Sequence, residues 1–147
     1  MRGLRLRSTL PKIAAAMCIA VAIVALPLTR AEAASYSPEI PFPPACGTCR
    51  MYSNQTLSDG GWVLKMQSDG NLVMRNPSGV ACFASNTQGH SNAHVTYQSD
   101  GNFVVYSSGG TALWASNTAG MWIGPSYSVS VNIGRFYVGY TLIHGPC

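Results

Sequence analysis

The sequence predicts an all-β domain of three small antiparallel sheets, built from three internal repeats. Residues 65–89 align with residues 96–120 at an offset of 31 without a gap, and 13 of the 25 pairs are identical. Turn-forming residues recur every 8–12 residues or so, and after residue 33 no stretch sustains the period of an amphipathic helix. Since one short unit cannot bury its own apolar face, we expect three units to close around one core.

Residues 1–33 have the three parts of a secretory signal peptide. Four basic residues precede an apolar run at residues 13–28, and an A-x-A pattern ends at Ala33. The alternative is a membrane anchor, but these 16 apolar residues are fewer than the roughly 20 that a spanning helix needs. We therefore expect cleavage after Ala33, a secreted protein, and no insertion of the mature chain into a membrane.

The charge of the chain is concentrated in this leader. The formal net charge is +4, with nine Lys and Arg against five Asp and Glu, but the leader holds five of the basic residues and one of the acidic ones. Four basic and four acidic residues remain after residue 33. Such a neutral chain lacks the basic surface that binds nucleic acid, so we expect no nucleic-acid partner.

Four cysteines follow the leader, which is typical of two disulfides in an exported chain. They are Cys46, Cys49, Cys82 and Cys147. All three pairings stay open, and a bridge from Cys46 or Cys49 to the other two would stabilise the chain by a few kcal/mol. A redox or zinc role for the C-x-x-C pair lacks a βαβ pattern or a second such pair, so we expect no metal and no cofactor.

The domain organisation follows from the leader, the cysteines and the repeats. We expect residues 34–51, which are rich in proline, to form an extended lead-in that the cysteines hold in place. Residues 52–147 then form the folded binding domain.

The second copy contains a row of polar side chains. It reads QSDGNFVVY at residues 98–106, and alternation along a strand places five side chains on one face: Gln98, Asp100, Asn102, Val104 and Tyr106. Phe103 and Val105 then face the core. The row offers two amides, a carboxylate, an apolar patch and a phenol, which suits a ring that bears several hydroxyl groups. The simpler interpretation is that Asp-Gly only shapes a hairpin turn.

Catalysis is not expected from this row. Its single carboxylate has no second acid beside it, and no nucleophile and base are paired in the pattern. The sequence therefore predicts a binding protein without enzymatic activity and without catalytic residues.

The spacing Q-x-D-x-N-x-V-x-Y resembles the mannose-binding signature of the bulb-type, snowdrop-agglutinin-like lectins. Residues 98–106 match it at all five positions, and ALWASNTAG at 112–120 is similar to the ending of that family's repeat. The resemblance covers residues 52–140 and implies a β-prism II fold that binds mannose-containing glycans without a metal. It also implies roles for the row: Asp100 and Asn102 bind the axial 2-hydroxyl, Gln98 the 3-hydroxyl and Tyr106 the 4-hydroxyl, while Val104 packs on the sugar ring.

The other two copies depart from the signature. The first keeps Gln67, Asp69, Asn71 and Val73, but Arg75 stands where the tyrosine belongs, so a second sugar site there is weakened or altered. The third copy, at an offset of 33, has no polar row and is interpreted as structural; its matching residues are Val131, Ile133, Arg135, Tyr137 and Gly139. We interpret Trp62 and Trp122 as core or interface residues.

Two functional hypotheses remain open at this point. The leading one is a secreted mannose-type lectin, whose shallow sites need multivalency through two sites or a homo-oligomer. The alternative is a lectin-fold scaffold for protein interaction or antibacterial action, similar to bacteriocin-like relatives, with weak or no sugar binding. Such relatives usually carry two prism domains in tandem, whereas this chain has room for one.

Overall fold

The computed structural model describes residues 39–43, 45 and 49–147, and all its regular elements are β-strands in three four-stranded antiparallel sheets. The first sheet contains β3 (Thr56–Asp59), β4 (Trp62–Met66), β5 (Leu72–Arg75) and β6 (Ala81–Ala84). The second contains β2 (Arg50–Met51), β7 (His94–Tyr97), β8 (Phe103–Tyr106) and β9 (Ala112–Ala115). The third contains β1 (Glu39–Pro41), β10 (Ser128–Asn132), β11 (Arg135–Val138) and β12 (Thr141–His144).

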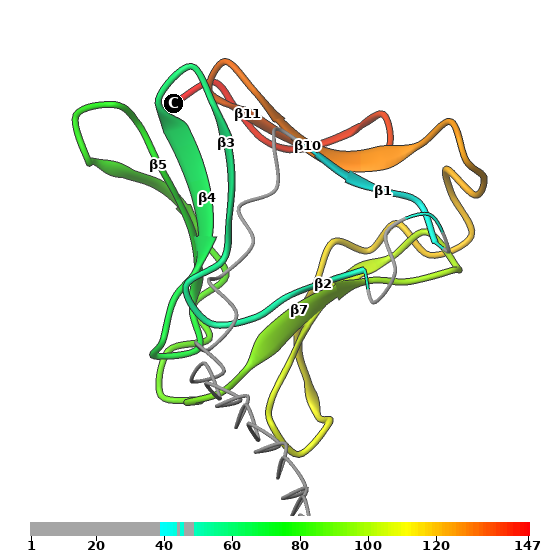
Figure 1. The fold of residues 1–147 in the computed structure, drawn as a ribbon, viewed down its shortest axis with the longest axis horizontal. Helices are drawn as coiled ribbons and strands as arrows, with labels where there is room; N and C mark the ends of the chain where they lie inside the picture. Colours follow the sequence, from blue (N-terminus) through cyan, green and yellow to red (C-terminus); the bar gives the residue numbers. More distant parts are fainter. Residues whose placement is uncertain (1–38, 44, 46–48) are drawn as a thin grey trace, which may run out of the picture.

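The predicted fold class is confirmed. Three sheets form the sides of a prism around one interior (Figure 1), and each contains a three-stranded repeat: β4–β5–β6, β7–β8–β9 or β10–β11–β12. In the part of the chain that the structure describes, no helix is long and apolar enough to cross a membrane. The expected signal peptide and Cys46 lie outside the described residues.

The segment before the repeats contributes the fourth strand of every sheet. In chain order, β1 joins the third sheet, β2 the second and β3 the first, each as an edge strand (Figure 1). Ile40 on β1 lies opposite Val129, and Met51 on β2 lies opposite Val95. The region expected to be a lead-in therefore supplies two strands of the prism, and this chain segment ties the three sheets together.

The third unit keeps the architecture of the other two although its sequence differs. Each unit has a register shift between its second and third strands, and the unpaired residues there are Cys82, Leu113 and Ile143, all of which pack on the core. Its first turn is one residue shorter, since Val131 pairs with Phe136 where Tyr97 pairs with Phe103. The third unit is thus a structural repeat without the longer turn that holds the polar row.

The core is assembled from all three sheets, because alternate side chains of each face inward. Its central members are fully buried, among them Leu64 of the first sheet and Phe103 of the second. Aromatic rings join the sheets: the Phe136 ring centroid lies 5.4 Å from that of Phe83 and 6.0 Å from that of Phe103. These edge-to-face contacts between units are the favoured geometry for aromatic pairs.

A disulfide joins Cys82 on β6 to Cys147, with a Cα–Cα distance of 5.3 Å and a sequence separation of 65. Cys49 is also disulfide-bonded. Cys82 and Cys147 therefore pair with each other and not with the cysteines of the lead-in. The bridge fastens the end of the third unit to the first sheet and so closes the prism covalently.

We predict that the double change Cys82→Ala and Cys147→Ala lowers the free energy of unfolding by up to about 4 kcal/mol, because it frees a loop of this length in the unfolded chain. Urea unfolding of the variant and the wild type, both oxidised, measures the difference. A change below about 1 kcal/mol would contradict the stabilising role given to this bridge.

Candidate functional site

The polar row of the second copy lies on the outer face of the second sheet. Phe103 and Val105 are both 0% exposed and belong to the core. Asn102, Val104 and Tyr106 alternate with them and so face outward. Gln98 and Asp100 lie in the turn between β7 and β8. We call these five residues, from Gln98 to Tyr106, the Gln98 row.

The side chain of Asp100 stabilises the turn at the start of the row. The Asn102 N–H donates to Asp100 Oδ1 at 2.9 Å, and the Gly101 N–H donates to the Gln98 carbonyl at 3.0 Å. One carboxylate oxygen of Asp100 therefore shapes the turn, and the other is open to a ligand because Asp100 is exposed. Asp100 can therefore shape the turn and bind a ligand at the same time, so the two interpretations do not exclude each other.

Asn102 is fixed by the residues that end the repeat. Its Oδ1 lies 3.0 Å from Ser116 Oγ and accepts from the Thr118 N–H at 3.3 Å. Thr118, 1% exposed, donates its hydroxyl to the Gly101 carbonyl at 2.7 Å and contacts Ser116 Oγ at 2.7 Å. With its oxygen engaged inward, Asn102 presents its NH₂ group outward as a donor.

Ser116 and Thr118 are site residues that the sequence analysis did not identify. Their signal was visible, since the run ASNT is identical in both copies. Its function in the turn becomes evident only when β9 is placed beside β8. They hold Asn102 in position and do not themselves form part of the row.

Gln98 and Tyr106 form the other half of the row. Gln98 Nε2 donates to the Tyr106 hydroxyl at 2.6 Å, which leaves the Gln98 carbonyl oxygen as an acceptor and the phenol O–H as a donor. The Tyr106 ring stacks on His94, with ring centroids 5.9 Å apart and planes inclined by 28°. Burial, and then the positive charge of Arg50, lower the pKa of His94. Both effects favour the neutral form of the stacked imidazole.

The outward atoms of the row include both acceptors and donors of hydrogen bonds. Asp100 and Gln98 each offer an acceptor oxygen, while Asn102 and Tyr106 each offer a donor. Val104 is 3% exposed and has no part in the core cluster, so it forms the floor between these groups. An ordered set of donors and acceptors around a small apolar floor suits vicinal hydroxyl groups on a ring.

The first copy repeats the inner part of this arrangement and lacks the outer part. The Asn71 N–H donates to Asp69 at 2.9 Å, and Asn71 Oδ1 lies 3.0 Å from Ser85 Oγ, as in the second copy. Val73 is likewise 3% exposed. Gln67 has no side-chain partner among the described residues. Gln67, Asp69, Asn71 and Val73 therefore form an incomplete row, which we call the Gln67 row.

Arg75 occupies the position of the missing phenol and is engaged elsewhere. Its Nη1 donates to the carbonyl of Gly79 at 2.9 Å, in the turn between β5 and β6. The guanidinium has donors only, so it could not reproduce the donor and acceptor behaviour of a phenol beside Gln67.

The third copy has no comparable row. Val131, which the sequence alignment matched to Gln98, takes the place of the buried Tyr97 because the turn is one residue shorter, and it lies in the core. Ile133 and Arg135 are exposed at the turn between β10 and β11. Tyr137 and Gly139 lie on β11 and just after it. Within the described residues, His, Cys, Asp and Glu form no group of three or more that could hold a metal ion.

Three four-stranded antiparallel sheets around a shared core define the domain as a β-prism II. The garlic (Allium sativum) lectin is 39% identical, covers 56% of this chain and 78% of its own, and has a TM-score of 0.52. The monomeric mannose-binding lectins of Gastrodia elata are 28% identical over 72% of this chain and 93% of theirs, with a TM-score of 0.56. The chain belongs to the bulb-type mannose-binding lectin family.

The snowdrop (Galanthus nivalis) agglutinin is a further match, 28% identical over 63% of this chain and 84% of its own, with a TM-score of 0.54. That protein is mannose-specific and its structure contains methyl-α-D-mannoside. No protein-family model and no curated protein matches the chain.

Gly101 allows a test of how closely the segment around Met121 packs on the turn of the Gln98 row. Gly101 and Gly110 both have φ near +85°. A Cβ at Gly101 would overlap the carbonyl oxygen of Met121, whereas a Cβ at Gly110 would meet nothing within 4 Å. We predict that Gly110→Ala costs about 1 kcal/mol of stability and Gly101→Ala about 2 kcal/mol more, measured by urea unfolding. Equal costs would show that the close approach of Met121 is not a constraint.

Proposed function

We propose that this protein is a secreted, non-catalytic lectin that binds mannose-containing glycans through the Gln98 row. The observation that supports this most directly is the hydrogen bonding of the row. Its inner atoms form hydrogen bonds within the protein, and its outer atoms remain as ordered donors and acceptors. The relatives that bind mannose share the fold, and this chain keeps all five signature residues at 98–106.

The geometry suggests how a mannose ring would be held. The axial 2-hydroxyl would donate to the free oxygen of Asp100 and accept from the NH₂ group of Asn102. The 3-hydroxyl would donate to the Gln98 carbonyl, and the 4-hydroxyl would accept from the Tyr106 phenol. Because the protein already holds each of these side chains through a hydrogen bond, binding costs little side-chain entropy.

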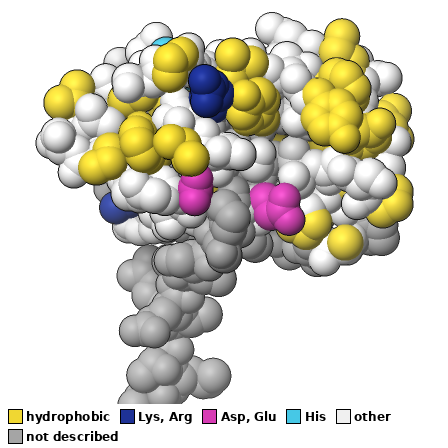
Figure 2. All heavy atoms as spheres, turned by 90° about the horizontal axis from the view of Figure 1, so that it is seen from above, with side chains coloured by type: hydrophobic (Ala, Val, Ile, Leu, Met, Phe, Trp, Pro, Cys, Tyr) yellow, Lys and Arg dark blue, Asp and Glu magenta, His cyan; other side chains and the backbone are white. Residues whose placement is uncertain are grey.

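A single row of this kind binds weakly. Four or five hydrogen bonds of about 1 kcal/mol each correspond to a dissociation constant around millimolar. Useful affinity then requires several sites that act together, and the incomplete Gln67 row or a second copy of the chain would supply them. The face shown in Figure 2 has few charged side chains, which suits an uncharged partner.

Export and the lack of catalysis are part of the same proposal. The leader pattern of residues 1–33 supports secretion, and a Cys82–Cys147 disulfide is stable in the oxidising space that exported proteins enter. Asp100 has no second carboxyl group in the row, which fits binding of a glycan without cleavage of it.

The double change Asp100→Ala and Asn102→Ala tests the assignment. We predict that it reduces binding of methyl α-mannoside at least 10-fold, because two or three hydrogen bonds are lost. NMR titration of backbone amides near Val104, together with a glycan array, measures the loss. Tyr106→Phe, which keeps the ring and removes one hydroxyl, should weaken binding about 5-fold.

The first copy provides the matched control. Asp69→Ala with Asn71→Ala makes the same change in an equivalent turn and leaves the Gln98 row intact, so the Val104 amide should still titrate with mannoside as in the wild type. Undiminished glycan binding by the Asp100/Asn102 variant would overturn the proposal. Absence of any response of the wild type at tens of millimolar mannoside would favour the protein-interaction or antibacterial scaffold.

A second prediction concerns the Gln67 row. We expect Arg75→Tyr to give Gln67 the partner that Gln98 has in Tyr106, and to strengthen mannoside binding at this row about 5-fold through one added hydrogen bond. Titration shifts of the Val73 amide measure it. Arg75→Ala is the control, because it removes the guanidinium without adding a phenol; equal affinities of the two variants would refute the prediction.

A further inference from the structure

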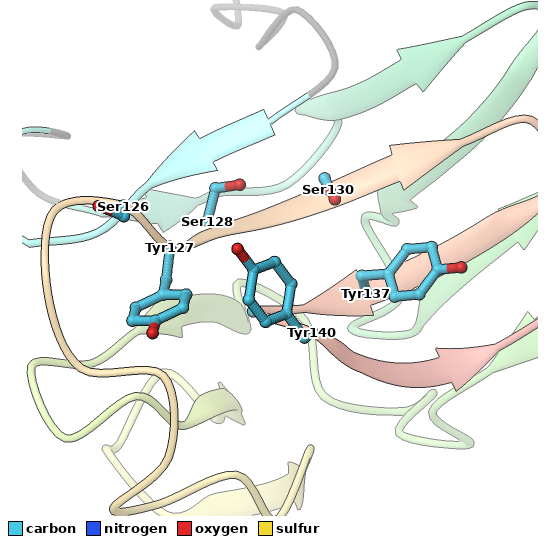
Figure 3. A pocket seen from close by; sticks show the side chains of 7 residues that line it. Ser126, Tyr127, Ser128, Ser130, Tyr137 and Tyr140 are labelled. Atoms are coloured by element: carbon cyan, nitrogen blue, oxygen red, sulfur yellow. The ribbon is translucent and has the colours of Figure 1, made fainter.

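A small pocket lies on the outer face of the third sheet, the sheet that lacks the signature (Figure 3). Its cavity volume is about 240 Å³. Gly139 and six residues with a hydroxyl group line it: Ser126, Tyr127, Ser128, Ser130, Tyr137 and Tyr140. We call it the third-sheet pocket. It does not depend on the Gln98 row.

The pocket occupies the place that the rows occupy on the other sheets. Tyr137 lies opposite Ser130, just as Val104 lies opposite Thr96 in the second sheet. Gly139 follows two residues later, at the position that Tyr106 has in the Gln98 row. The same location on the fold is thus built from different side chains.

Gly139 makes room for the ring of Trp122 behind the pocket. A Cβ at this position would overlap the Trp122 ring, so only glycine admits Trp122 against the turn between β11 and β12. The Trp122 indole N–H donates to Thr141 Oγ1 at 2.7 Å, which fixes the ring. The ring of Trp122, from the segment before β10, therefore lies where the third sheet would otherwise have the side chain that corresponds to Tyr106.

Trp122 in turn orients two of the lining tyrosines. The Tyr140 centroid lies 5.0 Å from that of Trp122 and 5.5 Å from that of Tyr127, with planes inclined by 67° and 84°. Tyr127 also contacts Trp122 at 5.6 Å. Tyr140 is 71% exposed although it is braced on two sides. A large ring held in place and open to solvent is a ready surface for a ligand.

The serines add directional hydrogen bonds. Ser128 Oγ donates to Glu39 Oε2 at 2.9 Å, so its lone pairs remain as acceptors. Ser130 lies on the same face of β10, next to Tyr137 (Figure 3). The carboxylate of Glu39 stands beside the pocket and disfavours an anionic ligand. The lining contains no Asp, Glu, Lys, Arg or His, so recognition there rests on hydroxyl groups and aromatic faces.

From these features we propose that the third-sheet pocket binds a single uncharged pyranose residue, which stacks a C–H face on Tyr140 and hydrogen-bonds to Ser128, Ser130 and the phenols. The negative face of an aromatic ring favours the slightly positive C–H groups of a sugar. The volume is below the roughly 300 Å³ at which pockets for drug-sized ligands begin, so it fits one ring. A protein partner would need a broad interface, not a small concavity.

Trp122 reports on the pocket through its ring contacts with Tyr127 and Tyr140. We would titrate ¹⁵N-labelled wild type with the methyl glycosides of mannose, glucose, galactose and N-acetylglucosamine to tens of millimolar, and follow the Trp122 indole N–H, assigned with Trp122→Phe. We expect at least one glycoside to shift this resonance saturably. The shift should persist in the Asp100→Ala, Asn102→Ala variant, which separates this site from the Gln98 row.

Variants of the pocket decide the proposal. Tyr140→Ala should abolish the shift, and Ser130→Ala, a smaller change that leaves the aromatic cluster intact, should raise the dissociation constant about 5-fold. Ile133→Ala, an exposed residue of the same sheet outside the pocket, should leave the shift unchanged. No shift with any glycoside, an undiminished shift in both pocket variants, or a shift that follows protein concentration without sugar would overturn the proposal.

Discussion

Each three-stranded unit of this protein has an apolar face that it cannot bury alone, and the rest of the structure depends on how the three units bury these faces together. Leu64, Phe103 and Phe136 are fully buried only because the faces of the three sheets meet. The segment containing β1, β2 and β3 adds one edge strand to the third, the second and the first sheet in turn. Separation of any unit would therefore break the hydrogen bonds between its sheet and this segment. The Cys82–Cys147 bridge closes the remaining open side.

Because the inner faces carry the stability, the outer faces are free to differ. The first sheet keeps the inner hydrogen bonds of the row but has Arg75 in place of the phenol, and the second keeps all five residues. The third has lost one residue of the turn, and with it the Asp-Gly-Asn geometry, and presents Tyr140 and its neighbours. One framework thus supports three outer faces of different chemistry.

The sequence predicts the features that depend on local periodicity. Alternation along β8 separates Phe103 and Val105 from the row, and the gapless repeat sets the units. Features that depend on long-range placement could not be predicted in this way. Four cysteines allow three pairings, and the strand role of residues 50–51 has no local signal. Trp122 stands outside the repeat, so nothing in the pattern connects it to Gly139.

The second and third sheets are linked through one stretch of chain. Thr118 holds the Gly101 carbonyl, and the chain then brings the Met121 carbonyl against Gly101. The next residue is Trp122, which has a positive φ of 51° and turns into the aromatic cluster of the third sheet. The stretch of chain that closes the turn of the Gln98 row therefore also places the ring that packs against Tyr127 and Tyr140 of the third-sheet pocket. Glycine at positions 101 and 139 serves one purpose, since each admits a neighbour from this stretch.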